Sequence, residues 1–317
     1  MTRPQSRKRD LLTLLDLDPK EIGEILVRAR EFKRGPDRHP EVLKGKVLGL
    51  FFEKSSTRTR ISFEVAAARL GGSAIFLTNA QMQISRGELL EDTVRVLGRY
   101  LDGIVVRTFS QETLEFWAAH ARVPVINGLT DLHHPCQILG DLLTIQEKLG
   151  ELKGRKIAYV GDGNNVAHSL IEGAAAMGMR IALACPEGYR PDPKIVGVGS
   201  EMARRTGGTV EITSDPREAV RQADAVYTDV WTSMGQEEET AERARKFQGY
   251  QINTELLALS AHGALVLHCL PAHREEEITA EVMEGPQSAI WDQAENRLYV
   301  QMALLELLMG NSPLPKR

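Results

Sequence analysis

Short apolar runs alternate with longer amphipathic stretches along most of this chain. From residue 45 the apolar runs "KVLGLFF", "SAIFLTN", "GIVVRTF" and "VPVING" are separated by segments with helical spacing of apolar residues. Such alternation of strand and helix predicts a parallel sheet with helices on both faces. The fold class is therefore α/β.

The same alternation restarts after "ELKGR" and predicts a second sheet. A chain of 317 residues is also long for a single hydrophobic core, so two domains are expected. We predict two doubly wound parallel-sheet domains, residues 1–148 and 149–317. The last amphipathic run predicts a C-terminal helix at about 293–309, which we expect to return to the first domain. The second series of apolar runs is "KIAYVGD", "RIALACP", "TVEIT", "DAVYTDV" and "ALVLHCL".

Charge and cysteine content exclude several classes of protein. A net charge of −4 and a pI near 6.1 give no general attraction to nucleic acid or to an anionic membrane, and no run reaches the roughly 20 apolar residues of a membrane helix. Three widely spaced cysteines without a CxxC pair favour neither a disulfide framework nor a structural zinc site. We expect a cytoplasmic protein, with a short mitochondrial presequence as the alternative.

The stretch "SSTRTR" places arginines where a helix is expected to begin. A helix N-terminus carries partial positive charge and favours Asp or Glu in its first turn. Here Arg58 and Arg60 occupy that turn, and the first acid is Glu64. Ser56 alone could be an ordinary helix cap. Amides, hydroxyls and a guanidinium gathered at one point suit a phosphate, so the stretch predicts an oxyanion site.

Further candidates follow other predicted strands of the first domain. Arg107 stands at the end of "GIVVR", and a lone arginine there is commonly a surface residue. Pro135 suits a first helical turn, which places His134 at the helix start and Gln137 one turn later. A neutral histidine at that place can donate to a developing oxyanion, although a single histidine is more often structural.

In the second domain, "VGDGNNVAHSL" approaches a dinucleotide-binding fingerprint. The third glycine is missing because Val166 stands there, so the fingerprint is incomplete and no cofactor is predicted. A nicotinamide-dependent dehydrogenase remains the rival from another enzyme class. Asp229 follows a strand and suits a substrate ammonium group. Cys269 follows another strand, and Arg297 is predicted in the first turn of the last helix.

Together these stretches resemble the aspartate and ornithine carbamoyltransferase family over nearly the whole chain. "SSTRTR" and "HPCQ" are similar to its carbamoyl-phosphate signatures, and "DVWTSMGQE" and "HCLPAHREEEIT" to those of its ornithine-specific branch. The resemblance implies transfer of a carbamoyl group from carbamoyl phosphate to the δ-amine of L-ornithine, giving L-citrulline and phosphate without a cofactor or a metal. Acetylornithine and putrescine are the alternative acceptors.

The resemblance assigns roles residue by residue, with the first domain binding carbamoyl phosphate and the second binding ornithine. The implied catalytic groups are Arg58, Arg107, His134, Asp229 and Cys269, and the separate roles of the last two stay open. Ornithine would be held by Asn165, Asp229, Ser233 and Met234. Carbamoyl phosphate would be held by Ser56, Thr57, Arg58, Thr59, Gln83, Arg107, His134, Gln137, Cys269, Leu270 and Arg297.

The resemblance also implies an assembly. Gln83 matches a family position that reaches into a neighbouring subunit, so a homotrimer, or a multiple of trimers, with shared active sites is expected. Three residues depart from the family pattern: Ser85, Gly140 and Glu275 stand where glycine, alanine and glycine are usual. Arg60 receives no role, and its spacing predicts an ion pair with Glu64.

Overall fold

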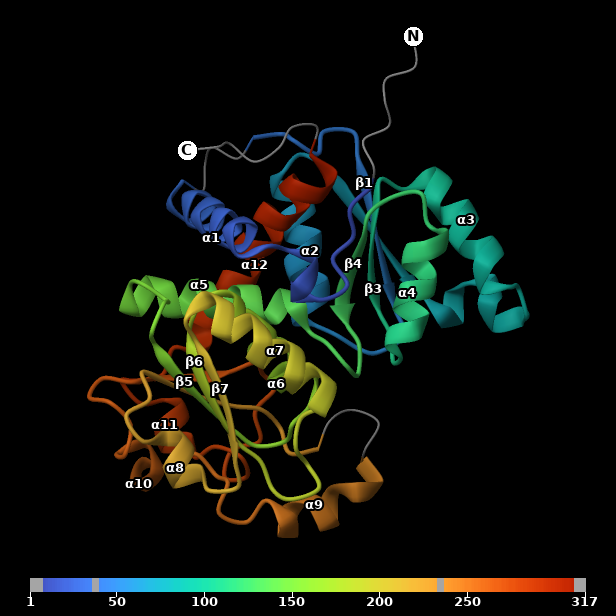
Figure 1. Ribbon diagram of the computed structural model, residues 1–317. Helices are drawn as coiled ribbons and strands as arrows, with labels where there is room; N and C mark the ends of the chain where they lie inside the picture. The colour runs from blue at the N-terminus through green and yellow to red at the C-terminus, as the bar shows by residue number, and fades with distance from the viewer. Residues whose placement is uncertain (1–7, 36–39, 233–236, 311–317) are drawn as a thin grey trace. The chain divides into compact units, whose positions relative to one another are not determined.

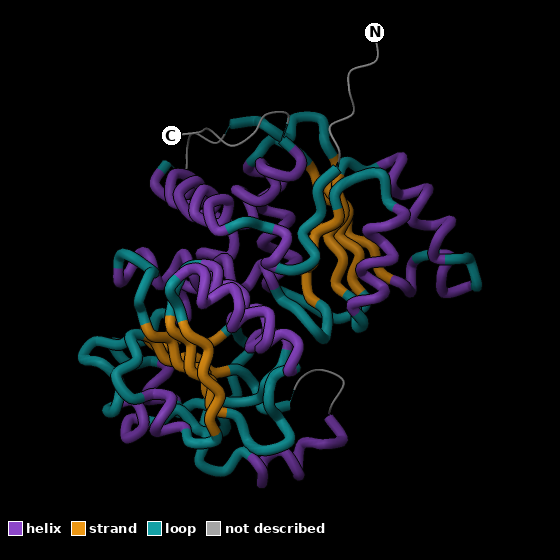
Figure 2. Tube along the Cα trace, in the orientation of Figure 1, coloured by secondary structure: helices purple, strands orange, loops and turns teal. Residues whose placement is uncertain are grey.

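The computed structural model describes residues 8–35, 40–232 and 237–310, which form two compact units. Unit 1 comprises the described residues of Met1–Cys136 and Arg297–Arg317, and unit 2 is Gln137–Asn296. Each unit contains one parallel sheet with helices around it (Figures 1 and 2). The predicted α/β class with two doubly wound parallel sheets is confirmed.

The sheet of unit 1 has four parallel strands in the order β2-β1-β3-β4. β1 and β3 are buried along almost their whole length, as expected for central strands covered on both faces. The order reverses between β1 and β3, so their carboxyl ends flank a switch point, where ligands bind in sheets of this kind. The strands are β1 (Val47–Phe52), β2 (Ser73–Thr78), β3 (Gly103–Arg107) and β4 (Val125–Leu129).

Helices cover both faces of this sheet. Figure 1 shows α1 and α2 on one side and α3 and α4 on the other. The core under α3 and α4 includes Phe51 and Trp117, whose ring centroids are 4.6 Å apart. The elements are η1 (Leu14–Asp16), α1 (Pro19–Arg34), α2 (Arg58–Arg69), η2 (Asn79–Gln81), η3 (Gln83–Arg86), α3 (Leu90–Tyr100) and α4 (Gln111–His120).

The last helix, α12 (Ile290–Met309), begins earlier than predicted. Ala289 and Ile290 are buried, so the apolar face of the helix extends upstream of the segment that the sequence pattern singled out. Arg297 therefore lies two turns inside α12, and its predicted place in the first turn is wrong. Within unit 1 the helix is tied to α1 by a two-pronged ion pair, in which Arg28 Nε donates to Glu306 Oε2 at 2.6 Å and Nη2 to Oε1 at 3.0 Å.

The sheet of unit 2 has five parallel strands in the order β7-β6-β5-β8-β9. Its order reverses between β5 and β8, which creates a second switch point. Segments that follow these two strands are therefore expected to lie side by side. The strands are β5 (Lys156–Val160), β6 (Arg180–Ala184), β7 (Thr209–Thr213), β8 (Ala225–Thr228) and β9 (Leu265–His268).

Figure 1 shows α6 and α7 on one side of this sheet and α8, α10 and α11 on the other. In the described part of the chain no helix is both long and apolar enough to cross a membrane. The helices are α5 (Pro135–Leu149), α6 (Asn165–Ala176), α7 (Pro193–Thr206), α8 (Pro216–Val220), η4 (Glu237–Glu239), α9 (Thr240–Lys246), α10 (Thr254–Leu257) and α11 (Ala280–Met283).

Two glycines of α7 provide a matched test of how α6 and α7 pack. A Cβ at Gly199 would clash with Ile171 Cγ2 of α6, whereas a Cβ at Gly197 would meet nothing within 4 Å. We expect Gly199→Ala to lower the free energy of unfolding by about 1–3 kcal/mol through overpacking. Gly197→Ala should raise it by roughly 0.5–1 kcal/mol, because alanine favours the helix. Urea denaturation measures both, and equal effects would contradict the close contact.

Candidate active site

Helix α2 begins directly beyond the carboxyl end of β1, at the switch point of unit 1. Thr57 is its N-cap residue, but the Thr57 side chain makes no capping hydrogen bond, and no acid stands in the first turn. The positive end of the helix is therefore reinforced by Arg58 instead of being neutralised by a carboxylate. This arrangement suits an anion bound from outside the helix.

Three arginines of unit 1 lie close enough to His134 for their charges to act on it. Arg107 ends β3 and Arg297 lies in α12; both are buried, and Arg297 Nη2 donates to Thr59 Oγ1 at 3.1 Å. Burial lowers the pKa of His134 well below 6.5, and the positive charges of Arg297, Arg107 and Arg58 lower that pKa further. His134 is thus a neutral imidazole among cations, able to donate a hydrogen bond without bringing a charge of its own.

The other residues of unit 1 predicted to bind carbamoyl phosphate differ in their exposure. Thr59 is buried, Ser56 half-buried, and Thr57 and Arg58 are exposed just before or within the first turn of α2. Gln83 is exposed on η3, and among the described residues no hydrogen bond or ion pair joins it to the arginines.

Two nearby cations have partners of their own. Arg60 Nε donates to Glu64 Oε1 at 2.9 Å, which confirms the predicted ion pair, and its guanidinium lies 3.7 Å from the centroid of the Phe76 ring. Lys54 forms an ion pair with Asp131. Arg60 and Lys54 are therefore each paired with an acidic residue of unit 1.

In unit 2, the carboxylate of Asp229 is fixed at the end of β8. Its Oδ1 accepts hydrogen bonds from Cys269 Sγ at 2.9 Å and from the Val230 N–H at 2.8 Å. Its Oδ2 accepts from Asn164 Nδ2 at 2.7 Å. Asn164 is the N-cap of α6, so the segments after β5 and β8 meet as the strand order requires. Asn165 begins α6 and is half-buried.

Sequence reasoning selected Asn165 and missed Asn164. The signal was present, because a helix N-cap after a strand of a parallel sheet is held at the carboxyl edge. The assignment of Asn165 to ornithine stays a prediction.

The segment that carries Cys269 and Leu270 is also held by hydrogen bonds. The Leu270 N–H donates to His268 Nδ1 at 2.9 Å, and His268 Nε2 lies 3.0 Å from Glu277 Oε1. Since Nδ1 accepts, the proton of the neutral ring is on Nε2, which donates to Glu277. His268 and Glu277 are fully buried; both lie within "HCLPAHREEEIT", but sequence reasoning assigned neither a role.

Arg243 binds three groups close to Asp229. It donates to Asp162 Oδ2 at 2.7 Å, to the Trp231 carbonyl at 2.9 Å and to Glu239 Oε2 at 2.9 Å. Burial raises the pKa of Asp162 to about 6, although Arg243 acts in the opposite direction. The predicted ornithine-binding residues Ser233 and Met234 lie outside the described residues.

Two groups of described side chains have donor atoms close enough for a metal ion, within 4.8 Å of one another. They are Asp229, His268 and Cys269, and His273, Glu276 and Glu277. In the first group both ring nitrogens of His268 already bond to the protein, so a metal ion would have to displace one of those bonds. The absence of a required metal stays a prediction.

The glycine-rich turn after β5 is occupied by the protein's own chain. A Cβ at Gly163 would clash with the backbone of Arg190 and Pro191, and the Gly163 N–H donates to the Tyr189 carbonyl at 2.8 Å. In a dinucleotide-binding turn the glycine admits a pyrophosphate. Here the missing side chain of Gly163 leaves room for residues 189–191. Close packing of the chain is therefore a sufficient reason for a glycine at this position.

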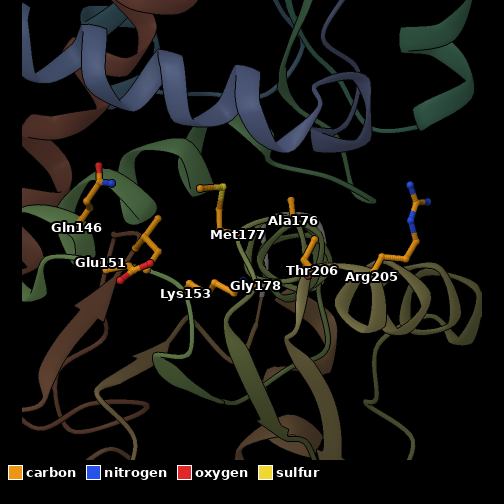
Figure 3. A pocket seen from close by; sticks show the side chains of 9 residues that line it. Gln146, Glu151, Lys153, Ala176, Met177, Gly178, Arg205 and Thr206 are labelled. Atoms are coloured by element: carbon orange, nitrogen blue, oxygen red, sulfur yellow. The ribbon is translucent and has the colours of Figure 1, made fainter. Parts of the chain in front are cut away.

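A pocket of about 470 Å³ lies at the other edge of the unit 2 sheet (Figure 3). Its lining comes from the C-terminal ends of α6 and α7 and the turn before β5, including Lys153, Met177 and Thr206. These segments precede strands, whereas Asp229 and Cys269 follow strands. The pocket is therefore separate from the carboxyl edge, where substrates of such sheets bind.

The fold is that of a two-unit α/β protein with a cluster of polar and charged side chains at the carboxyl edge of each parallel sheet. Residues 9–147 match the family model described as the aspartate/ornithine carbamoyltransferase carbamoyl-P binding domain. Residues 153–308 match the Asp/Orn binding domain of the same family. The chain belongs to the aspartate/ornithine carbamoyltransferase family.

Relatives named ornithine carbamoyltransferase cover nearly the whole chain. The chain is 58% identical over 301 residues to that of Gloeobacter violaceus, covering 95% of this chain and 96% of that protein. It is 55% identical over 306 residues to that of Syntrophus aciditrophicus, covering 95% of this chain and 100% of that protein. The structure of the Pyrococcus furiosus protein matches with a TM-score of 0.93 at 48% identity, covering 96% and 98%. The predicted family and enzyme class are confirmed.

The lowered pKa of His134 predicts a pH dependence of stability. In the unfolded chain a histidine has a pKa of about 6.5, so below that pH the unfolded state binds a proton that the folded state excludes. The contribution of His134 is present above about pH 6.5 and is lost as the pH falls. His134→Asn should reduce the slope of unfolding free energy against pH between pH 6.5 and 5 by up to about 1.4 kcal/mol per unit.

Urea denaturation at several pH values measures this slope. His262→Asn, which changes an exposed histidine of unit 2, is the control and should keep the wild-type slope. An unchanged slope in His134→Asn would contradict the buried neutral imidazole.

Proposed function

We propose that this protein transfers the carbamoyl group of carbamoyl phosphate to the δ-amine of L-ornithine, giving L-citrulline and phosphate, a reaction of arginine metabolism. The observation that carries the proposal is the gathering of Arg58, Arg107 and Arg297 around a neutral His134 at the switch point of unit 1. The relatives described above support ornithine as the acceptor.

In this proposal the phosphate group is bound at the start of α2. The free amides of the first turn and the guanidinium of Arg58 supply hydrogen-bond donors and positive charge. Ser56, Thr57 and Thr59 add hydroxyls from the same segment. The leaving phosphate takes the electron pair of the broken C–O bond, so the same donors stabilise the product as it forms.

The carbamoyl oxygen becomes negative when the amine attacks the carbamoyl carbon. We assign three groups to that oxygen: Thr59, Arg107 and His134. Arg297, which donates to Thr59, is assigned to carbamoyl phosphate beside it. Gln137 is assigned to the NH₂ group of the carbamoyl moiety. A well-placed donor to such an oxyanion is typically worth about 3 kcal/mol. Because His134 is neutral, it donates without protonating the substrate first.

Ornithine is assigned to unit 2. Its δ-ammonium group has a pKa of about 10.4 in water and must lose a proton before it attacks. Asp229 and Cys269, joined by a hydrogen bond at 2.9 Å, are the proposed groups that orient the amine and lead the proton away. Asn165, Ser233 and Met234 are assigned to the rest of ornithine, and Leu270 to the place beside the reacting amine.

The assembly is proposed to be a homotrimer, or a multiple of trimers, in the cytoplasm. Gln83 is exposed on η3, and unit 1 also exposes large apolar side chains, among them Ile61, Ile75 and Leu89. A second copy of the chain covering this surface would bury them and bring Gln83 to a neighbouring site.

Replacing Arg58 tests the phosphate role. Arg58→Ala should lower citrulline formation at least about 10³-fold, because both a charge and a two-pronged donor are lost. Arg60→Ala is the matched control two residues away, where the partner is Glu64, and it should keep turnover within about threefold because surface ion pairs contribute little. Sedimentation of each variant checks that assembly is kept. Near-normal turnover in Arg58→Ala would exclude the proposed role.

Replacing Asp229 tests the acceptor half. Asp229→Asn should lower kcat/KM for ornithine about 10²-fold or more while the KM for carbamoyl phosphate changes little, because a carboxylate that orients the amine is lost. Asp224→Asn, at the other end of β8, breaks bonds to Arg155 and Lys156 and should change only stability. Steady-state assays with ornithine, acetylornithine, putrescine and aspartate measure both variants. An unaltered response to ornithine would remove Asp229 from the site.

A further inference from the structure

A buried polar network in unit 2 begins at Gln137. Gln137 Nε2 donates to Asp141 Oδ1 at 2.8 Å, one turn further along α5. Asp141 is fully buried and Gln137 nearly so. Burial of a carboxyl group without hydrogen bonds destabilises the folded state, so the donors around Asp141 are needed for stability.

Gln293 of α12 is the second amide that donates to Asp141. Its Nε2 lies 2.7 Å from Asp141 Oδ1 and 3.1 Å from the Tyr227 hydroxyl, while its Oε1 accepts from the His268 N–H at 2.9 Å. A backbone N–H only donates, so it fixes Oε1 toward His268 and the NH₂ group toward Asp141. One glutamine thereby joins α5 to the end of β9, directly before Cys269.

The carboxylate in turn fixes the orientation of the Gln137 amide. The NH₂ group of Gln137 faces Asp141 Oδ1, an oxygen that accepts the hydrogen bond. With that group engaged, Oε1 is the atom of the amide that points away from Asp141. A flipped amide would place two oxygens against each other in a buried site, where water cannot compensate.

We propose that Asp141 and Gln293 are positioning residues that make Gln137 present its carbonyl oxygen to the carbamoyl NH₂ group. This inference rests on the proposed function, in which Gln137 binds carbamoyl phosphate. The NH₂ group of the substrate is a donor and matches Oε1, whereas the methyl group of an acetyl phosphate has no N–H to offer. A site oriented in this way selects a carbamoyl group over an acyl group of nearly the same shape.

Asp141→Leu in the full-length chain is the direct test. Leucine has a similar shape and no acceptor, so the Gln137 amide loses the partner that fixes its orientation. We expect the KM for carbamoyl phosphate to rise about tenfold or more, since one oriented hydrogen bond is lost. The inhibition constant of acetyl phosphate, measured by competition with carbamoyl phosphate, should change less than about twofold, because its methyl group never used that bond.

Gln293→Met is the second variant, for the case that Asp141→Leu does not fold. It keeps the length of the side chain and removes the donor that holds Asp141 Oδ1, so Asp141 fixes Gln137 less firmly and a smaller divergence of the two constants in the same direction is expected. Gln287→Met is the matched control, because Gln287 donates only to the Ala264 carbonyl in the described structure; both constants should stay at wild-type values.

Thermal unfolding of each variant separates stability from selectivity. Equal changes in both constants, or no change in either, with normal wild-type turnover would overturn the inference alone. A wild-type protein that makes no citrulline would overturn the proposed function, and this inference with it.

Discussion

The reversal of strand order in each sheet is the constraint on which both clusters depend. Where neighbouring strands send their following helices to opposite faces, the loops after them diverge and leave backbone and side-chain groups open at the edge. In unit 1 this places the start of α2 next to Arg107. In unit 2 it places Asn164 against Asp229. The strand order of each sheet therefore determines which segments meet at its carboxyl edge, whichever side chains they carry.

Burial then decides what the side chains at these edges can do. Around His134, the same low-dielectric surroundings that strengthen donors also disfavour a fourth positive charge, so the imidazole stays neutral. Three guanidiniums near one another repel unless an anion joins them. In the proposed function, the phosphate group of the substrate would place negative charge beside these guanidiniums.

Features carried by neighbouring residues could be predicted from the sequence, and features that join distant residues could not. The two sheets, the start of α2 and the Arg60–Glu64 pair all follow from local spacing. The bond of Arg297 to Thr59 spans 238 positions, and that of Arg243 to Asp162 spans 81. No periodicity links such positions, because only the folded sheet brings them together.

Glu275 shows how a departure from a family pattern is accommodated. Its φ is +70°, in the left-handed region where glycine is easiest, so the usual glycine there has a backbone reason. The Glu275 side chain compensates by accepting a hydrogen bond from the Ala280 N–H at 2.9 Å, at the start of α11. The positive φ of Glu275 and its hydrogen bond to Ala280 both lie in one short loop. Glutamate at this position therefore leaves the bond between Glu277 and His268 in place.

Gln293 illustrates why a neutral amide is suited to a buried junction between a carboxylate and a backbone N–H. A carboxylate at position 293 could accept from His268 but would oppose Asp141, unless one of the two acids bound a proton. A lysine could donate to Asp141 but not accept from His268. The carboxamide alone satisfies both neighbours without a titrating group. The orientation of Gln137 then depends on its bond to Asp141, which Gln293 supports without adding a second acid to the buried site.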